Sequence, residues 1–459
     1  MSVGNHYEHW GRAVKAAVIA VLLAGLLPAC VLAGKGAEPE AVTICGVTYA
    51  VVPDEQMRTW GFPLPRIPRE RNAAWIYFKA MNAYSEPERG SELRALRDAV
   101  LEGKWTAESA PLEKYIEGNA KAFALVKKAA AMAECYFPPL GNQGDTFEDV
   151  SVSGLSIPYL TQMRELARFL VVCGKKLETA GDPAKALDAY LLAPRVGYHT
   201  SRGPMLIHGL LGLAVNRMAL GAIEQCVLRH DLDEHLLAEV QAHVHKLSRR
   251  RPDIRWAMAN EKVCSVQVVD HVLEHPEVYG GLWEGRLALW LAGLKESEWH
   301  AIARADVREY WEILEKGLCM ALPEYLNSNV SQELTRRVRA RRFPPNLMAI
   351  VGPALPRMTY AWNELWWTVL DVEFALARYR AEHGRYPEKI EDAKDLMLSD
   401  GIDPFSGERL KYRLEKDGSF TLWSVGENVK DDGGKVEKAA SRWMEDDIVW
   451  NSRLLRGEK

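Results

Sequence analysis

The chain has 459 residues, with 58 lysines and arginines against 62 aspartates and glutamates, so its formal net charge is −4. With 48% hydrophobic and 26% charged residues it has a globular composition, which excludes a disordered or collagen-like chain. The slight acidity argues against nucleic acid as a partner, because binding to a phosphate backbone requires a basic surplus.

The first 33 residues have the order of a signal peptide. Arg12 and Lys15 precede an uncharged apolar run over residues 16–32, and Ala33 provides the small residue after which we expect cleavage. Two rival interpretations are lipidation at Cys30, where Leu-Pro-Ala-Cys resembles a bacterial lipobox, and an uncleaved anchor of marginal length. All three predict export to the periplasm or cell envelope, with membrane attachment only through the signal or lipid anchor.

Export changes the cysteine count, because cleavage or lipidation removes Cys30 from the seven in the sequence. The remaining six are widely spaced and contain no CxxC pair, which argues against a structural zinc site. In an oxidising compartment they pair as disulfides or stay as buried free thiols, and both interpretations are open. These cysteines are Cys45, Cys135, Cys173, Cys226, Cys264 and Cys319.

Residues 34–71 are predicted as an extended segment followed by a proline-rich connector. The β-branched stretch at 41–52 predicts one or two short strands. Four prolines follow between residues 53 and 68, from which we expect no regular element there.

Residues 72–342 are predicted to form a helical domain, since apolar residues recur there at spacings of three and four. The fold class is mainly α: an irregular helical bundle or an array of helix pairs. One segment resembles a tetratricopeptide repeat, in which small residues let two antiparallel helices approach closely, and an ordinary helical hairpin is the alternative. The residues at the repeat's offsets are Gly174, Gly181, Ala186, Tyr190 and Ala193.

Residues 346–459 are predicted to form a small α+β domain. An apolar stripe predicts a helix over 358–383, which Gly384 ends, and a short helical stretch follows at 389–398. Alternating residues on either side of a Lys-Asp-Gly turn predict a β-hairpin of residues 410–414 and 419–425.

Six short blocks in this last quarter of the chain resemble the C-terminal domain of the major pseudopilin of type II secretion systems. In order they are HGRYP (383–387), DPFSG (403–407), LKY (410–412), LWSVG (422–426), DDGG (431–434) and DDIVW (446–450). Unlike a pseudopilin, the module lies behind some 350 residues, so we expect a folded tail and not a pilus subunit. The helical part, including Asn72-Ala73-Ala74-Trp75, resembles uncharacterised exported proteins of planctomycete-type bacteria, which implies no activity.

The pseudopilin resemblance implies a calcium site in the loop between the last strands. Clustered aspartates in a glycine-rich loop supply the hard oxygen ligands that Ca²⁺ prefers. An insert at 435–445 carries lysine and arginine and departs from the family, and a solvated acidic loop is the alternative. The implied ligands are Asp431, Asp432, Asp446 and Asp447.

Residues 271–275 match the HxxEH motif of inverted zinc peptidases. In that motif His271 and His275 would bind zinc and Glu274 would activate water. Pro276 follows directly and biases His275 away from helical geometry, so a zinc hydrolase is the alternative and not the leading hypothesis.

The sequence as a whole predicts an exported, non-enzymatic envelope protein that acts as an interaction or scaffold module with a protein partner. A calcium-stabilised C-terminal domain is part of this expectation. Two alternatives stay open, namely the zinc-dependent hydrolase and an accessory component of a type II secretion-like system.

Overall fold

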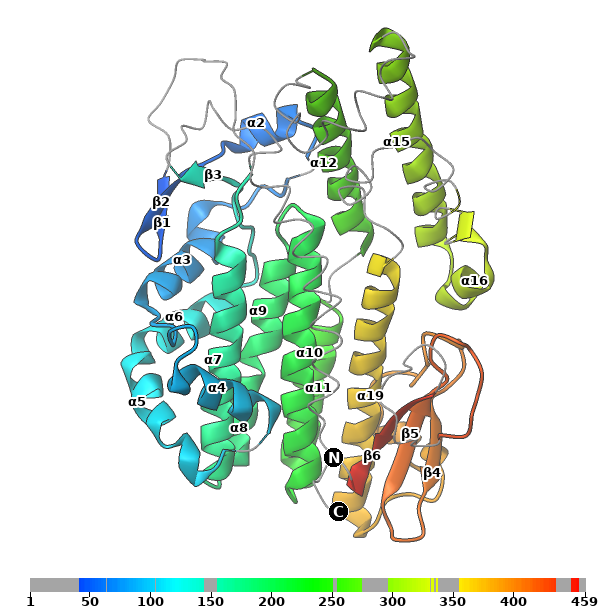
Figure 1. The fold of residues 1–459 in the computed structure, drawn as a ribbon. Helices are drawn as coiled ribbons and strands as arrows, with labels where there is room; N and C mark the ends of the chain where they lie inside the picture. The colour runs from blue at the N-terminus through cyan, green and yellow to red at the C-terminus, as the bar shows by residue number, and fades with distance from the viewer. Residues whose placement is uncertain are drawn as a thin grey trace.

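The computed structural model describes residues 41–62, 64–103, 105–143, 155–250, 254–274, 296–330, 332–333, 336, 355–434 and 447–453 (Figure 1). Across these residues the protein is mainly helical and contains two three-stranded antiparallel sheets, which confirms the predicted mainly α class. The signal-peptide segment lies outside the described residues.

The first sheet consists of β1 (Ala41–Ile44), β2 (Val47–Val51) and β3 (Leu140–Gln143), in that order. The first two strands confirm the prediction for residues 41–52, whereas β3 was not predicted. Cys45 and Gly46 join β1 to β2 in a two-residue turn. Both residues have positive φ (51° and 82°), the geometry that matches the twist of a hairpin. Asn82 fixes this turn, because its Oδ1 accepts from the Cys45 amide at 2.7 Å.

The expectation that residues 53–68 form no regular element is wrong, because α2 (Asp54–Thr59) lies within them. Pro53 precedes the first helical residue, a position where its fixed φ and missing amide proton do no harm. Asp54 and Glu55 favour the helix because they place negative charge at its N-terminus.

The helical body follows as a series of packed segments: η1 (Arg69–Arg71), α3 (Ala74–Ala83), α4 (Glu92–Glu102), η2 (Ala107–Ser109), α5 (Pro111–Gly118), α6 (Ala120–Ala131), α7 (Tyr159–Thr179), α8 (Pro183–Tyr190) and α9 (Leu192–Ser201). The chain breaks at Asn119, which separates α5 from α6. The α7–α8 pair approaches closely at Gly174, where a Cβ would overlap the Tyr190 ring. This is the close helix contact that the small residues of the segment predict.

Three long helices form the centre of the molecule: α10 (Leu206–Arg229), α11 (Glu234–Ser248) and α19 (Leu355–His383). In the described part of the chain α10 is the one helix long and apolar enough to cross a membrane, and 72% of its apolar window is buried inside the protein. At one end of the molecule α12 (Ile254–Glu274) packs against α15 (Glu296–Cys319), which leads into α16 (Leu322–Asn327).

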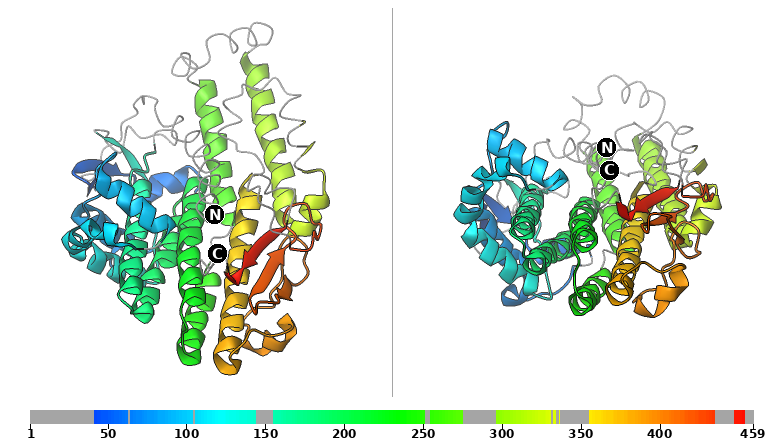
Figure 2. Two further views of the ribbon diagram at one scale, coloured as in Figure 1. Left: turned by 60° about the horizontal axis from the view of Figure 1, so that its bottom comes forward. Right: turned by 90° about the horizontal axis from the view of Figure 1, so that it is seen from below.

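α19 separates two hydrophobic cores. Its residues Trp367, Leu370 and Phe374 belong to the core of the helical body, whereas Leu365 and Val369 belong to a second core under the C-terminal sheet. That sheet has the order β4 (Lys411–Leu414), β5 (Phe420–Ser424) and β6 (Ile448–Asn451), and a short helix, η5 (Ile390–Leu396), precedes it. β4 and β5 confirm the predicted hairpin. Figure 2 shows the resulting order from the N-terminal helices through α10 to α19 and the sheet.

A buried polar network joins α11 to α19. Gln241 Nε2 donates to Asp371 Oδ1 at 2.8 Å, and Arg378 donates to Gln241 Oε1 at 3.0 Å and to Glu234 Oε1 at 2.6 Å. Asp371 Oδ2 also accepts from the Ser399 amide at 2.8 Å. The buried members of the network, Gln241 and Asp371, both have partners, so this side of α19 is firmly held.

The six cysteines among the described residues are all free thiols. Four of them, Cys135, Cys173, Cys226 and Cys264, are buried, whereas Cys45 and Cys319 are exposed. Of the two interpretations of the cysteines, the structure supports free thiols.

Candidate functional site

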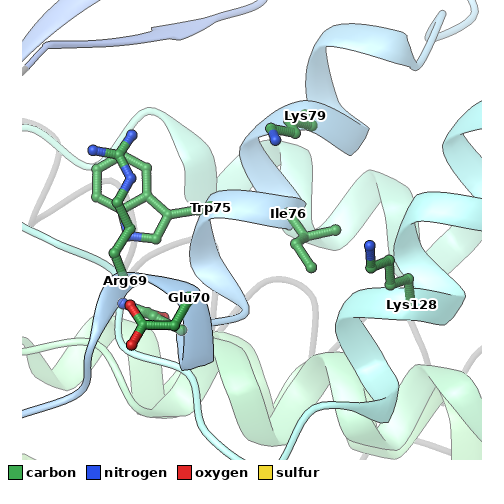
Figure 3. Close-up of a pocket in the computed structure, with 7 residues that line it drawn as sticks. Arg69, Glu70, Trp75, Ile76, Lys79 and Lys128 are labelled. Atoms are coloured by element: carbon green, nitrogen blue, oxygen red, sulfur yellow. The ribbon is translucent and has the colours of Figure 1, made fainter.

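A hollow of about 410 Å³ opens on the surface of the helical body between η1, α3 and α6 (Figure 3). Figure 3 shows the Arg69 side chain over the Trp75 ring on one side, Lys79 and Lys128 on the other, and Ile76 between them. The lining residues are Arg69, Glu70, Asn72, Trp75, Ile76, Lys79 and Lys128.

Buried hydrogen bonds of Asn72 fix the wall of this hollow. Its Nδ2 donates to the Tyr136 carbonyl at 2.8 Å, and its Oδ1 accepts from the amides of Ala74 at 3.1 Å and Tyr136 at 3.0 Å. The side chain thus starts α3 and ties it to a distant segment. Arg71 adds a salt bridge to Glu134 at 2.7 Å. The backbone under the hollow is therefore set before any ligand arrives.

The charge in the hollow is positive. Three cations line it against the single carboxylate of Glu70. The Arg69 guanidinium lies 4.0 Å from the centroid of the Trp75 ring, a cation–π contact. Lys79 and Lys128 are exposed and form no salt bridge with any residue that the structure describes. Two free ammonium groups beside an aromatic and an aliphatic side chain suit an anion that carries an apolar part.

The sequence did not predict this hollow. Trp75 and Lys79 are one turn apart on α3, which indicated a helix and nothing more. Lys128 comes from α6, and Arg69 precedes α3 in η1. The packing of α3 against α6 brings them together, and no local pattern encodes that packing.

A second group of charged residues lies buried where α7 and α10 end. Glu178 Oε2 accepts from the Tyr190 hydroxyl at 2.7 Å and lies 3.6 Å from Lys175 Nζ. Its Oε1 lies 3.3 Å from His230 Nε2 and 4.0 Å from Arg229 Nη1. Burial raises the pKa of Glu178, but Lys175, Tyr190, Arg229 and His230 together lower it below its ordinary value.

This group includes a metal-like set, since donor atoms of Glu178, Cys226 and His230 lie within 4.8 Å of one another. The surroundings do not fit a cation. Lys175 and Arg229 already supply positive charge, and both Glu178 oxygens already have partners. Burial also raises the pKa of the Cys226 thiol, which would have to lose its proton to bind a metal. We therefore assign the group to stability.

The structure brings three of the four predicted calcium ligands together. Asp447 Oδ2 accepts from the amides of Asp432 at 3.0 Å and Gly434 at 2.8 Å, which closes the loop. Asp431 Oδ1 accepts from the Trp423 indole at 3.0 Å. Asp446 lies outside the described residues.

The charge of this loop is only partly balanced. Burial raises the pKa of Asp447, and the nearby charges of Asp431 and Asp432 raise it further, against the effect of the two amides. Lys430 pairs with Asp432 at 2.6 Å. Among the described residues only the Glu178, Cys226 and His230 set places three donor atoms within 4.8 Å, so these aspartates are neighbours without a closed metal site.

The zinc motif falls at the end of α12. His271 and Glu274 belong to that helix, which ends at Glu274. Their side chains, and the whole of His275, lie outside the described residues.

Comparison with known proteins gives no relative, because no protein-family model, curated protein or solved structure matches the chain.

Proposed function

We propose that the protein is a non-enzymatic interaction or scaffold protein of the cell envelope, which binds an acidic segment of a protein partner in the hollow between η1, α3 and α6. The observation that carries this proposal is the pair of lysines, Lys79 and Lys128, which form no salt bridge with a described residue and lie beside Trp75 and Ile76. Carboxylates of the partner would pair with the lysines. An apolar side chain next to them would contact Ile76 and the exposed part of Trp75.

The strength of this binding follows from the exposure of the hollow. An exposed ion pair contributes about 0.2–1 kcal/mol, and the open surface buries little of a ligand. For one short acidic segment we therefore expect a dissociation constant of roughly 10 μM to 1 mM. Such a surface suits a scaffold that gains affinity from several contacts.

A peptide selection tests the proposal. A random dodecapeptide library is selected on the wild-type protein and on the double variant Lys79→Glu/Lys128→Glu. A matched control, Lys121→Glu/Lys127→Glu, makes the same charge change at exposed lysines of α6 that do not line the hollow.

We expect wild type and control to enrich peptides in which aspartate or glutamate flanks an aromatic or aliphatic residue, and the hollow variant to lose them by roughly tenfold or more in affinity. Equal enrichment on all three proteins, or peptides without acidic residues, would contradict the proposal.

The finer features of the fold belong to the same proposal. We propose that α7 with α8 and α9 acts as one tetratricopeptide-like unit, which is supported by the contact of Gly174 with Tyr190. We propose that the C-terminal sheet and α19 form a pseudopilin-like module, supported by the order of the sequence blocks.

Export stays an expectation from residues 1–33. A partner from a type II secretion-like system is the one that this module suggests.

We also propose that Ca²⁺ stabilises the C-terminal loop. The observation in favour of this site is that Asp447 Oδ1 is buried and accepts no hydrogen bond from any described residue. The carboxylates of Asp431 and Asp432 lie near it. Calorimetric titration with CaCl₂ should show binding, and the thermal midpoint should rise. The variant Asp447→Asn keeps the side-chain size and should lose both effects, whereas a wild type without binding heat or stabilisation would rule out the site.

A further inference from the structure

Two glutamates face each other inside the seam between α10 and α19. Glu224 on α10 is 6% exposed, and Glu373 on α19 is fully buried. Each glutamate lies seven residues beyond the contact of Arg217 with Trp366, so the two carboxyl groups face each other between the helices. Neither oxygen of Glu373 has a hydrogen-bond partner among the described residues. A proton held by the pair would supply the missing donor, because two ionised carboxylates offer only acceptors.

The charges that act on the pair are few. Arg217 and Arg229, both from α10, are the cations that act on Glu224, and Arg217 acts on Glu373. Neither arginine forms a salt bridge with either glutamate in the described part of the chain. The Arg217 guanidinium is held elsewhere, 3.3 Å from the centroid of the Trp366 ring. Among the described residues, therefore, no cation is in salt-bridge contact with either carboxyl group, although Arg217 acts on both from a distance.

The pair lies where the helical body contacts the C-terminal unit, because α10 belongs to the first and α19 carries the core of the second. α10 and α19 run parallel, since Gly209 lies against Tyr360, Arg217 lies over Trp366, and Glu224 meets Glu373 further along both helices. α19 also carries the second core, under the C-terminal sheet. A change in this seam would therefore alter how the C-terminal unit is held on the helical body.

We propose that Glu224 and Glu373 form a proton-dependent latch, which closes the α10–α19 seam while the pair holds a proton and loosens it when both carboxyls ionise. Two negative charges that face each other in a buried seam repel strongly, because the effective dielectric constant of the interior is low. Water entering the seam, or a small displacement of α19, relieves that repulsion. The satisfied network between α11 and α19 keeps the helix attached on its other side.

Hydrogen exchange followed by mass spectrometry tests the latch in the full-length protein. Peptides from α10 and α19 are compared at pH 6 and pH 8.5, after correction for the intrinsic exchange rate, with peptides from α3 and α6 as an internal reference. The variants are Glu373→Gln and Glu224→Gln, which keep the shape and remove one charge. Glu382→Gln, an exposed position near the end of α19, is the matched control.

In wild type and in the control, we expect seam opening to increase roughly tenfold for each pH unit over which the pair releases its proton, while the reference peptides stay constant. In both latch variants the increase should fall below twofold. Glu224→Gln decides the outcome if Glu373→Gln does not fold. Seam exchange that is equal at both pH values in wild type, or a wild-type response retained in Glu224→Gln, would overturn the latch.

Discussion

Two buried glutamates beside α10 have opposite surroundings. Glu178 has a donor or a cation at each oxygen, namely Tyr190 and Lys175 at Oε2 and His230 and Arg229 at Oε1. Glu373, in contrast, faces another carboxyl group, and neither of its oxygens has a hydrogen-bond partner among the described residues. The pKa of Glu178 is lowered, whereas burial and the charge of Glu224 raise the pKa of Glu373 well above its ordinary value. Both glutamates are buried, so the difference between their pKa shifts comes from the groups around them.

The two sites give stability opposite pH dependences. A lowered folded pKa, as for Glu178, contributes stability that is present above the ordinary value near 4.5 and is lost as pH falls through the folded pKa. A raised folded pKa, as for Glu224 at about 7, contributes stability that is present below about 4.5 and is lost as pH rises through 7. The free energy of unfolding should therefore decline in acid through Glu178, and decline between about pH 4.5 and pH 7 through Glu224.

The largest expected effect comes from breaking the paired site. Glu178→Ala leaves Lys175 and Arg229 without a counter-charge and the Tyr190 hydroxyl without an acceptor. We expect a loss of about 3 kcal/mol in the free energy of unfolding at pH 7, measured by urea denaturation. Glu113→Ala removes an exposed carboxylate that lies 4.0 Å from Lys176 and should change stability by less than about 0.5 kcal/mol. Similar losses in both variants would contradict the role given to pairing.

A smaller loss of stability should follow when Tyr190, the hydrogen-bond donor to Glu178, is displaced and no charge is removed. Gly174→Ala places a Cβ into the ring of Tyr190, whose hydroxyl donates to Glu178. Because Tyr190 is fully buried, we expect a loss of about 2 kcal/mol and a lower thermal midpoint. Gly118→Ala, with no heavy atom within 4 Å of the added Cβ, is the control and should cost nothing. An unchanged midpoint in Gly174→Ala would mean that α7 and α8 are not in close contact.

Glu373→Gln should change stability in the opposite direction. The variant removes the charge that has no partner, so at pH 8 we expect a gain of roughly 1–2 kcal/mol in the free energy of unfolding. At pH 5, where the pair is protonated, the variant should equal the wild type. Denaturation curves at both pH values measure the difference. A loss of stability at pH 8 would show that the ionised pair has a counter-charge after all.

The smallest effect on stability is expected in the hollow, where charge is unpaired but exposed. Lys79→Glu/Lys128→Glu should alter the free energy of unfolding by less than about 0.5 kcal/mol, because these ammonium groups stay in water. The same change should remove binding of acidic peptides. A stability loss of several kcal/mol would show that the lysines have a structural role, and the site would then not be a free recognition surface.

The sequence predicted those parts of the fold that follow from local patterns. Periodicity identified the long helices, and the alternation around residues 416–418 identified the β4–β5 hairpin. The sequence did not predict α2, where prolines indicated an irregular connector, or β3, a strand whose partner lies far away along the chain. The aspartates of the acidic loop were found through a resemblance. The hollow and the Glu224–Glu373 pair were not found, because each combines residues from separate helices.

The binding surface is tested most directly by lysine footprinting. The protein is acetylated with and without a dodecapeptide selected on the wild type, and the modification rate of each lysine is read by mass spectrometry. Our account predicts that the peptide slows the acetylation of Lys79 and Lys128, while Lys121 and Lys127 react at unchanged rates. Protection of other lysines, with Lys79 and Lys128 unaffected, would contradict the hollow as the recognition site.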